Sequence, residues 1–123
     1  MYQAFTGIIS KMSDEAPGKI KRQLIQEIRN FVDRYPDYEL VRYQDILTQN
    51  GLERSVESMQ RADVSKLNGQ CVMALLVGTY RADYLTGGWD DGPWTVLFEN
   101  GCIKRWLLRL KELDKKCEKE EAP

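Results

Sequence analysis

The longest apolar run in the chain, CVMALLVG at residues 71–78, restricts most strongly what the chain can fold into. The run is too short to cross a membrane, because a spanning helix needs about 20 apolar residues. Its wider context, GQCVMALLVGTYRADYL, is apolar on all sides at first and becomes polar only after Tyr80. A helix that is apolar all round lies at the centre of a protein, although a short apolar run also fits a buried strand. The length of the segment and the Ala-Leu-Leu at 74–76 favour a central helix.

Amphipathic helices are predicted on both sides of this run, because apolar residues recur there every three or four positions. Pro17 suits the first turn of one helix, and Pro36 ends it, since a proline ring does not fit after a helical residue. The final helix is expected to begin near Gly101. The predicted buried residues are Phe5, Ile8, Ile9 and Met12 in the first helix, Ile20, Leu24, Ile28, Phe31 and Tyr35 in the second, and Ile103, Trp106, Leu107, Leu110 and Leu113 in the last.

The segment at 37–68 has a weaker apolar pattern, and two further helices are expected there. Asp37 is a suitable cap for the first of them, and Gly51 suits the left-handed residue that ends it. The second is expected to pack only shallowly. The residues expected to face the core are Val41, Ile46 and Leu47 in the first of these helices and Leu52, Val56 and Met59 in the second.

Together these patterns predict an all-α fold, a compact single domain of five or six helices at residues 1–114. A glycine- and tryptophan-rich connection precedes the last helix, and the charged tail at 115–123 is expected to fray. WTVLF at 94–98 is the one segment in which a short strand competes with a helical turn.

Composition narrows the classes of function. The chain has 18 basic and 19 acidic residues, and this balance argues against a nucleic-acid partner. A local basic patch at Lys104, Arg105, Arg109 and Lys111 is interleaved with acids, which is typical of a solvated face. The chain contains no histidine, which excludes Ser-His-Asp and Cys-His catalysis and histidine zinc sites. Its three cysteines form no CxxC pair, so we expect no metal and no cofactor, and an odd count fits a reducing, cytoplasmic setting.

The stretch TGGWDDGPWTVLFENG at 86–101 places two of the three tryptophans in a glycine-rich connection. Because this connection joins the central helix to the last one, the end of the central helix is expected to lie near both tryptophans. The planar guanidinium group of an arginine can donate two parallel hydrogen bonds to a carboxylate or a phosphate. Indole rings stack on flat ligands, and the N-terminus of a helix attracts anions. The predicted ligand or partner contacts are Arg81, Asp83, Tyr84, Trp89, Trp94, Glu99 and Asn100.

Each of these residues also has a purely structural interpretation. Arg81 is suited to an ion pair with Glu99 or Asp83, and the tryptophans are suited to a lid over the core. Asn100 is an ordinary helix cap on that interpretation. The adjacent acids at 90–91 lack the spacing of a calcium loop and are expected to form a solvated turn.

The C-terminal part of the chain contains a recognisable set of spaced residues: Arg81, Ala82, Asp83, Leu85, Gly88, Phe98, Glu99, Gly101, Ile103, Arg109 and Leu110. In these residues the chain resembles a small bacterial and phage family known as the domain of unknown function 6508 family. The resemblance covers less than half of the chain and implies no particular activity. It implies a bacterial or mobile-element setting in the cytoplasm and a shared surface around 81–101.

We therefore expect a non-catalytic binding protein that captures a small anionic ligand, such as a nucleotide signal used in host defence. The alternative is a protein-protein adaptor or inhibitor, for example in counter-defence, that uses the same surface. An enzyme with Asp83, Asp91 or Glu99 as acid or base is a third hypothesis, which the missing histidine and the missing catalytic motif weaken. No membrane association is expected, and the sequence leaves the oligomeric state open.

The two tryptophans of the connection are predicted to differ in role. Trp94 follows Pro93 and precedes the apolar VLF, so Trp94→Ala is expected to lower the free energy of unfolding by about 3–5 kcal/mol. Trp89 lies between glycines and aspartates, so Trp89→Ala is expected to leave the melting midpoint unchanged and to weaken binding. Thermal melts of the two variants test this difference. Equal destabilisation by both substitutions would show that both tryptophans only cover the core.

Overall fold

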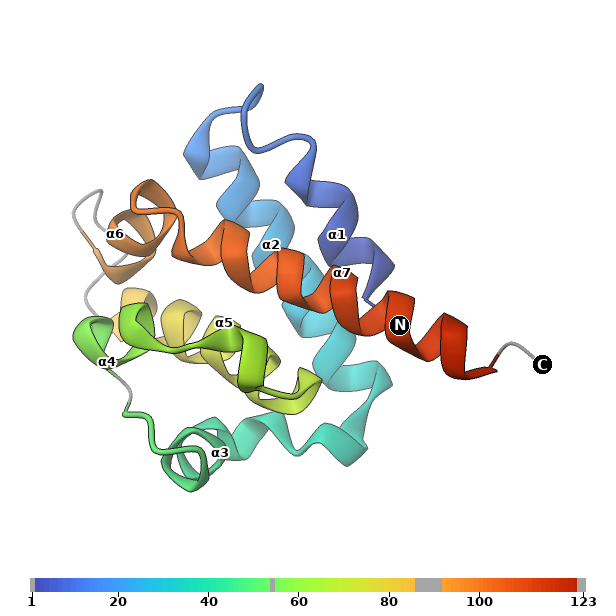
Figure 1. Ribbon diagram of the computed structural model, residues 1–123. Helices are drawn as coiled ribbons and strands as arrows, with labels where there is room; N and C mark the ends of the chain where they lie inside the picture. The colour runs from blue at the N-terminus through green and yellow to red at the C-terminus, as the bar shows by residue number, and fades with distance from the viewer. Residues whose placement is uncertain (1, 54, 86–91, 122–123) are drawn as a thin grey trace.

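The computed structural model describes residues 2–53, 55–85 and 92–121, without the side chains of 83–85 and 116–121. Helices are the only regular secondary structure in this part of the chain, which confirms the all-α prediction. It has seven α-helices where five or six were predicted (Figure 1). The elements are α1 (Gln3–Ile9), α2 (Pro17–Arg34), the 3-10 helices η1 (Pro36–Tyr38) and η2 (Leu40–Arg42), α3 (Tyr43–Gln49), α4 (Val56–Arg61), the 3-10 helix η3 (Val64–Lys66), α5 (Gly69–Leu85), α6 (Pro93–Glu99) and α7 (Cys102–Glu121).

Helix α5 forms the centre of the fold, as the apolar run predicted. Every residue from 71 to 79 is buried, and the helix packs against α2, α3, α6 and α7. In Figure 1, α5 lies between α7 and α3. Thr79, the one buried polar residue among those of this helix whose side chains the structure describes, donates its hydroxyl to the Leu75 carbonyl at 2.9 Å. The helix thereby satisfies its own polar groups inside an apolar core.

Helices α2 and α7 bury the apolar stripes that their sequences predicted. Pro17 stands in the first turn of α2, where a missing amide hydrogen has no cost. Helix α1 packs against both helices, and the Tyr2 backbone amide donates to the Asp114 carboxylate of α7 at 2.9 Å. The buried residues of the two stripes are Ile20, Leu24, Ile28 and Phe31 in α2 and Ile103, Trp106, Leu107 and Leu110 in α7.

The first of the two helices predicted at 37–68, the third in chain order, is wrong in its first half. Residues 36–42 form two 3-10 turns, and α3 begins only at Tyr43. The break lies at Glu39, which adopts a left-handed conformation with φ of 51° and so interrupts a right-handed helix. The turn directs Val41 outward, with 82% of the residue exposed, so the expectation that Val41 faces the core is also wrong. Ile46 and Leu47 are buried as expected.

The expected fourth helix also differs from its prediction, and α6 decides between the two alternatives for residues 94–98. This fourth helix, the second predicted at 37–68, is divided into two elements, α4 and the short η3. The Ser55 hydroxyl caps α4 by accepting a hydrogen bond from the Ser58 amide. WTVLF belongs to α6, so the helical alternative is the correct one, and α6 raises the helix count within the connection. Helix α7 runs to Glu121, so the predicted domain boundary at 114 falls inside a helix.

Among the described residues, no helix combines the length and the apolar character that crossing a membrane requires.

An aromatic cluster fastens the N-terminus to the start of α5. The Tyr2 ring stacks on Phe31 with ring centroids 5.7 Å apart, and its hydroxyl shares a hydrogen bond with the Tyr38 hydroxyl. The same hydroxyl lies so close to Gly69 that a Cβ atom there would overlap with it. Glycine at position 69 is therefore required by the close approach of a buried tyrosine.

Gly69→Ala is expected to lower the free energy of unfolding by about 1–3 kcal/mol, because the added methyl group displaces the packed Tyr2 ring. Gly7→Ala is the matched control: Gly7 also lies in a helix, but a Cβ atom there would meet no other atom within 4 Å. That control should raise stability by about 0.5–1 kcal/mol. Urea unfolding of both variants measures the difference, and a neutral or stabilising Gly69→Ala would show that Tyr2 does not pack here.

Candidate functional site

The structure places Arg81 at the surface, and no acidic residue that the structure describes forms an ion pair with it. Arg81 lies in the last turns of α5 and is exposed. Within the described part of the chain no ion pair joins it to Glu99, which is exposed at the end of α6. The side chains of Asp83 and Tyr84, and the whole of Trp89, lie outside the described residues, as do the acids at 90–91. The Arg81–Glu99 ion pair of the structural interpretation is therefore not formed.

Trp94 is buried, which corrects its assignment to a contact surface. Only 4% of the residue is exposed, and its ring stacks on Phe98 with centroids 5.9 Å apart. Pro93 begins α6, and this helix packs against α5 and α7. The indole is thus enclosed by helices, in line with its expected packing beneath the connection.

Asn100 has a structural role at the corner between α6 and α7. Its Oδ1 accepts from the Cys102 amide at 3.1 Å, and its Nδ2 donates to Gln60 Oε1 of α4 at 3.2 Å. Gly101 supplies the positive φ of 83° that the corner requires. The side chain of Asn100 therefore caps α7 and links the corner to α4, and it is occupied by contacts within the protein.

Arg81 instead borders a groove between α2 and α5, which we call the α2–α5 groove. This cavity has a volume of about 430 Å³, and η2 and the start of α3 also contribute to its lining. Its walls are largely apolar, and three charged side chains line it as well. The apolar lining residues are Ile28, Val32, Leu40, Val41 and Val77, and the charged ones are Arg29, Asp33 and Arg81.

The second arginine of the groove, Arg29, is held in place by Tyr80. Its Nη2 donates to the Tyr80 hydroxyl at 3.0 Å, and its Cζ lies 5.9 Å from the centroid of the Tyr80 ring. This hydrogen bond raises the pKa of Arg29 above its usual value, and an arginine is charged over the whole physiological range in any case. The groove therefore carries two exposed arginines, of which Arg29 is hydrogen-bonded to Tyr80, and Asp33 is the one carboxylate among the described residues that line it.

Neither Arg29 nor Tyr80 was identified as a site residue from the sequence. The spacing of Val77, Tyr80 and Arg81 does place all three on one face of α5. No local pattern, however, shows that this face meets α2, because the contact between Arg29 and Tyr80 spans 51 positions.

Comparisons with protein-family models, curated proteins and solved structures found no match to the chain. The resemblance to the domain of unknown function 6508 family therefore stays an expectation that rests on the residues quoted for it. In consequence, the geometry of the α2–α5 groove is the main basis for a functional proposal.

Proposed function

We propose that this chain is a non-catalytic binding protein that captures a small anionic ligand in the α2–α5 groove. The observation that carries the proposal is the pair of guanidinium groups, Arg29 and Arg81, on a groove with apolar walls. A ligand that satisfies both features has a negative group and an apolar or planar part. A nucleotide is a ligand of this kind.

The size of the groove and the hydrogen bond that orients Arg29 support this proposal. Its volume of about 430 Å³ falls within the range of about 300–1,000 Å³ that is typical of small-molecule sites. Tyr80 orients Arg29 before any ligand arrives, which reduces the entropy lost on binding. Arg81 has no acidic partner among the described residues, so pairing with an anion breaks no ion pair in this part of the chain.

The biological setting follows from the family resemblance and is part of the proposal. A cytoplasmic protein of phage or mobile-element origin that sequesters a nucleotide defence signal needs an affinity for its ligand and no catalytic group. The groove fits such a role, because a captured anion is neutralised by two cations and its apolar part is removed from water.

The exposed Val41 favours a second candidate, a protein-protein adaptor or inhibitor. Val41 is 82% exposed and lines the groove, so a partner seated on the groove would cover it. In this alternative, an acidic side chain of the partner pairs with Arg81 while an apolar side chain enters the groove.

The test is a binding screen of mono-, di- and cyclic nucleotides by thermal shift, followed by titration calorimetry of any nucleotide that raises the melting midpoint. Arg81→Ala and Arg29→Ala are each expected to weaken binding about 10- to 100-fold, because each removes a charged hydrogen bond. Arg22→Ala, which removes an exposed arginine of α2 outside the groove, is the matched control and should bind as the wild type does.

Equal affinity of the wild type and Arg81→Ala would contradict the assignment of the groove as the ligand site. If no nucleotide in the screen binds, the proposal of a nucleotide ligand is wrong. The melting midpoint of unliganded Arg81→Ala should equal that of the wild type, because the side chain is exposed and forms no ion pair in the described part of the chain.

A further inference from the structure

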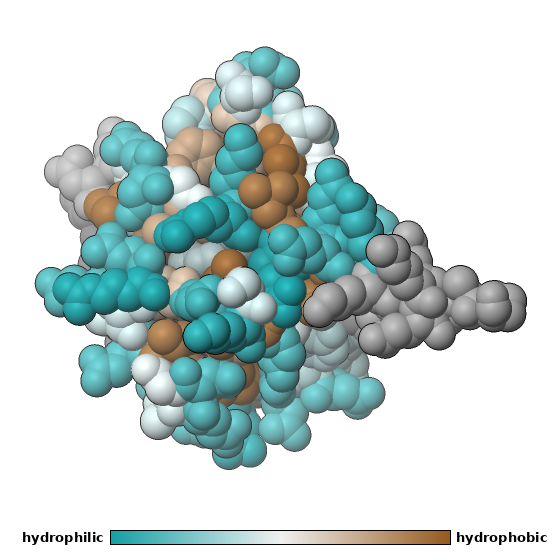
Figure 2. All heavy atoms as spheres, viewed as in Figure 1, coloured by the Kyte–Doolittle hydropathy of each residue, from teal (hydrophilic) through white to brown (hydrophobic). Residues whose placement is uncertain are grey.

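A second cavity, here called the η3–α7 cleft, lies between residues 61–65 and α7 and has a volume of about 450 Å³. It shares no lining residue with the α2–α5 groove. Three arginines line it: Arg61 at the end of α4, and Arg105 and Arg109 of α7. The spacing of four places Arg105 and Arg109 on the same face of α7. Hydrophilic side chains cover much of the face over α7, with separate hydrophobic ones between them (Figure 2).

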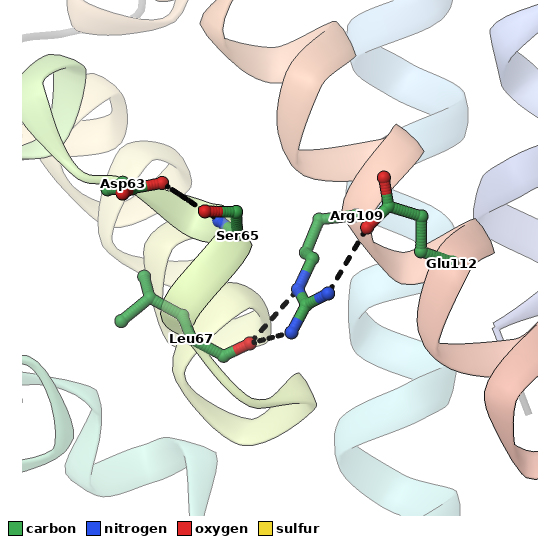
Figure 3. Close-up of polar contacts among 5 residues, drawn as sticks. All are labelled: Asp63, Ser65, Leu67, Arg109 and Glu112. Carbon is green, nitrogen blue, oxygen red and sulfur yellow. Dashed lines mark hydrogen bonds and ion pairs between the residues drawn. The ribbon is translucent and has the colours of Figure 1, made fainter.

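Arg109 serves the fold and forms a fixed wall of the cleft. Its Nε and Nη2 donate to the Leu67 carbonyl at 3.1 and 3.0 Å, and its Nη1 pairs with the Glu112 carboxylate at 3.1 Å (Figure 3). Only 11% of its side chain is exposed. The donors and the charge of Arg109 are therefore used within the protein.

The other two arginines of the cleft have no acidic partner in the part of the chain that the structure describes. Arg105 Nη2 donates to the Gln60 carbonyl at 3.3 Å and lies 2.9 Å from the Cys102 sulfur. These contacts fix the guanidinium without an opposing carboxylate. Arg61 is exposed, and none of the ion pairs between described residues includes it.

Both carboxylates that line the cleft already have partners. Asp63 accepts from the Ser65 amide and hydroxyl, as Figure 3 shows in part, and lies 3.9 Å from the Lys66 ammonium. The hydrogen bond from the Ser65 side chain lowers the pKa of Asp63, so this carboxylate is ionised at neutral pH. Glu112 pairs with Arg109. The lining carries three arginines and two carboxylates, a net charge of +1, and Lys66 beside Asp63 adds a cation from outside the lining.

We propose that the η3–α7 cleft binds the dianion of a phosphate monoester. The guanidinium groups of Arg61 and Arg105 hold the phosphate oxygens, since an arginine fork matches phosphate geometry and two cations match a dianion. The ester substituent lies against the apolar part of the lining, which includes Val64 and Leu108. Leu108 is 39% exposed, which leaves an apolar side chain at the edge of a charged cleft.

The experiment is an amide-detected NMR titration with phenyl phosphate as the probe and benzenesulfonate as the comparison, at constant ionic strength. Benzenesulfonate has a similar ring and a tetrahedral anionic group but only one negative charge. Phenyl phosphate is expected to shift the signals of residues 61–65 and 105–109 in a saturable way and to bind at least about tenfold more tightly than benzenesulfonate, as one additional charged contact predicts.

Arg61→Gln and Arg105→Gln are each expected to weaken the binding of phenyl phosphate about tenfold or more. Lys104→Gln is the matched control, because it removes an exposed cation of α7 that does not line the cleft, and it should bind as the wild type does. Arg105→Gln also removes the contact with the Gln60 carbonyl. If that variant does not fold, Arg61→Gln still tests the proposal, because Arg61 is exposed.

Equal affinity for the two probes, unchanged affinity of Arg61→Gln, or shifts confined to the α2–α5 groove would each overturn this proposal. Arg81→Ala should leave phenyl phosphate binding in the η3–α7 cleft unchanged. The proposal for the cleft and the proposal for the groove thus succeed or fail on different variants.

Discussion

The burial of α5 on every side is the constraint on which the rest of the structure depends. Residues 71–79 form a helix with no solvated face, so other helices must cover it all round, and α2, α3, α6 and α7 do so. The helix becomes polar where it leaves the core, and this is where Tyr80 and Arg81 meet α2. The position of the α2–α5 groove is therefore a consequence of where the apolar run ends.

The two proposed sites share one arrangement of cations. In each, one guanidinium is held by uncharged groups of the protein, Arg29 by the Tyr80 hydroxyl and Arg105 by the Gln60 carbonyl. In each, a second arginine, Arg81 or Arg61, is exposed and has no acidic partner among the described residues. Arg29 and Arg105 are exposed as well, but their hydrogen bonds orient them before binding. A chain that is nearly neutral overall thus concentrates positive charge in two small cavities.

The sequence predicted the long helices well because their patterns are local. Pro17 and the apolar stripe of α2 determine that helix, and the apolar run determines α5. The left-handed Glu39 was not predictable, since glutamate has no preference for that conformation, and the break it makes turned Val41 outward. Arg81 was identified as a site residue from its own surroundings. Its companion Arg29 was not, because the packing of α2 on α5 brings them to one groove from distant parts of the chain.

The central claim is that α5 is the core around which the other helices assemble, and native-state hydrogen exchange measures this directly. Amides of the buried part of α5 should exchange only through global unfolding, with an opening free energy equal to that from urea unfolding. Amides of α1, a short helix at the surface of the bundle, should exchange through smaller openings at lower free energy. Exchange of α5 at a lower free energy than α1 would contradict the account.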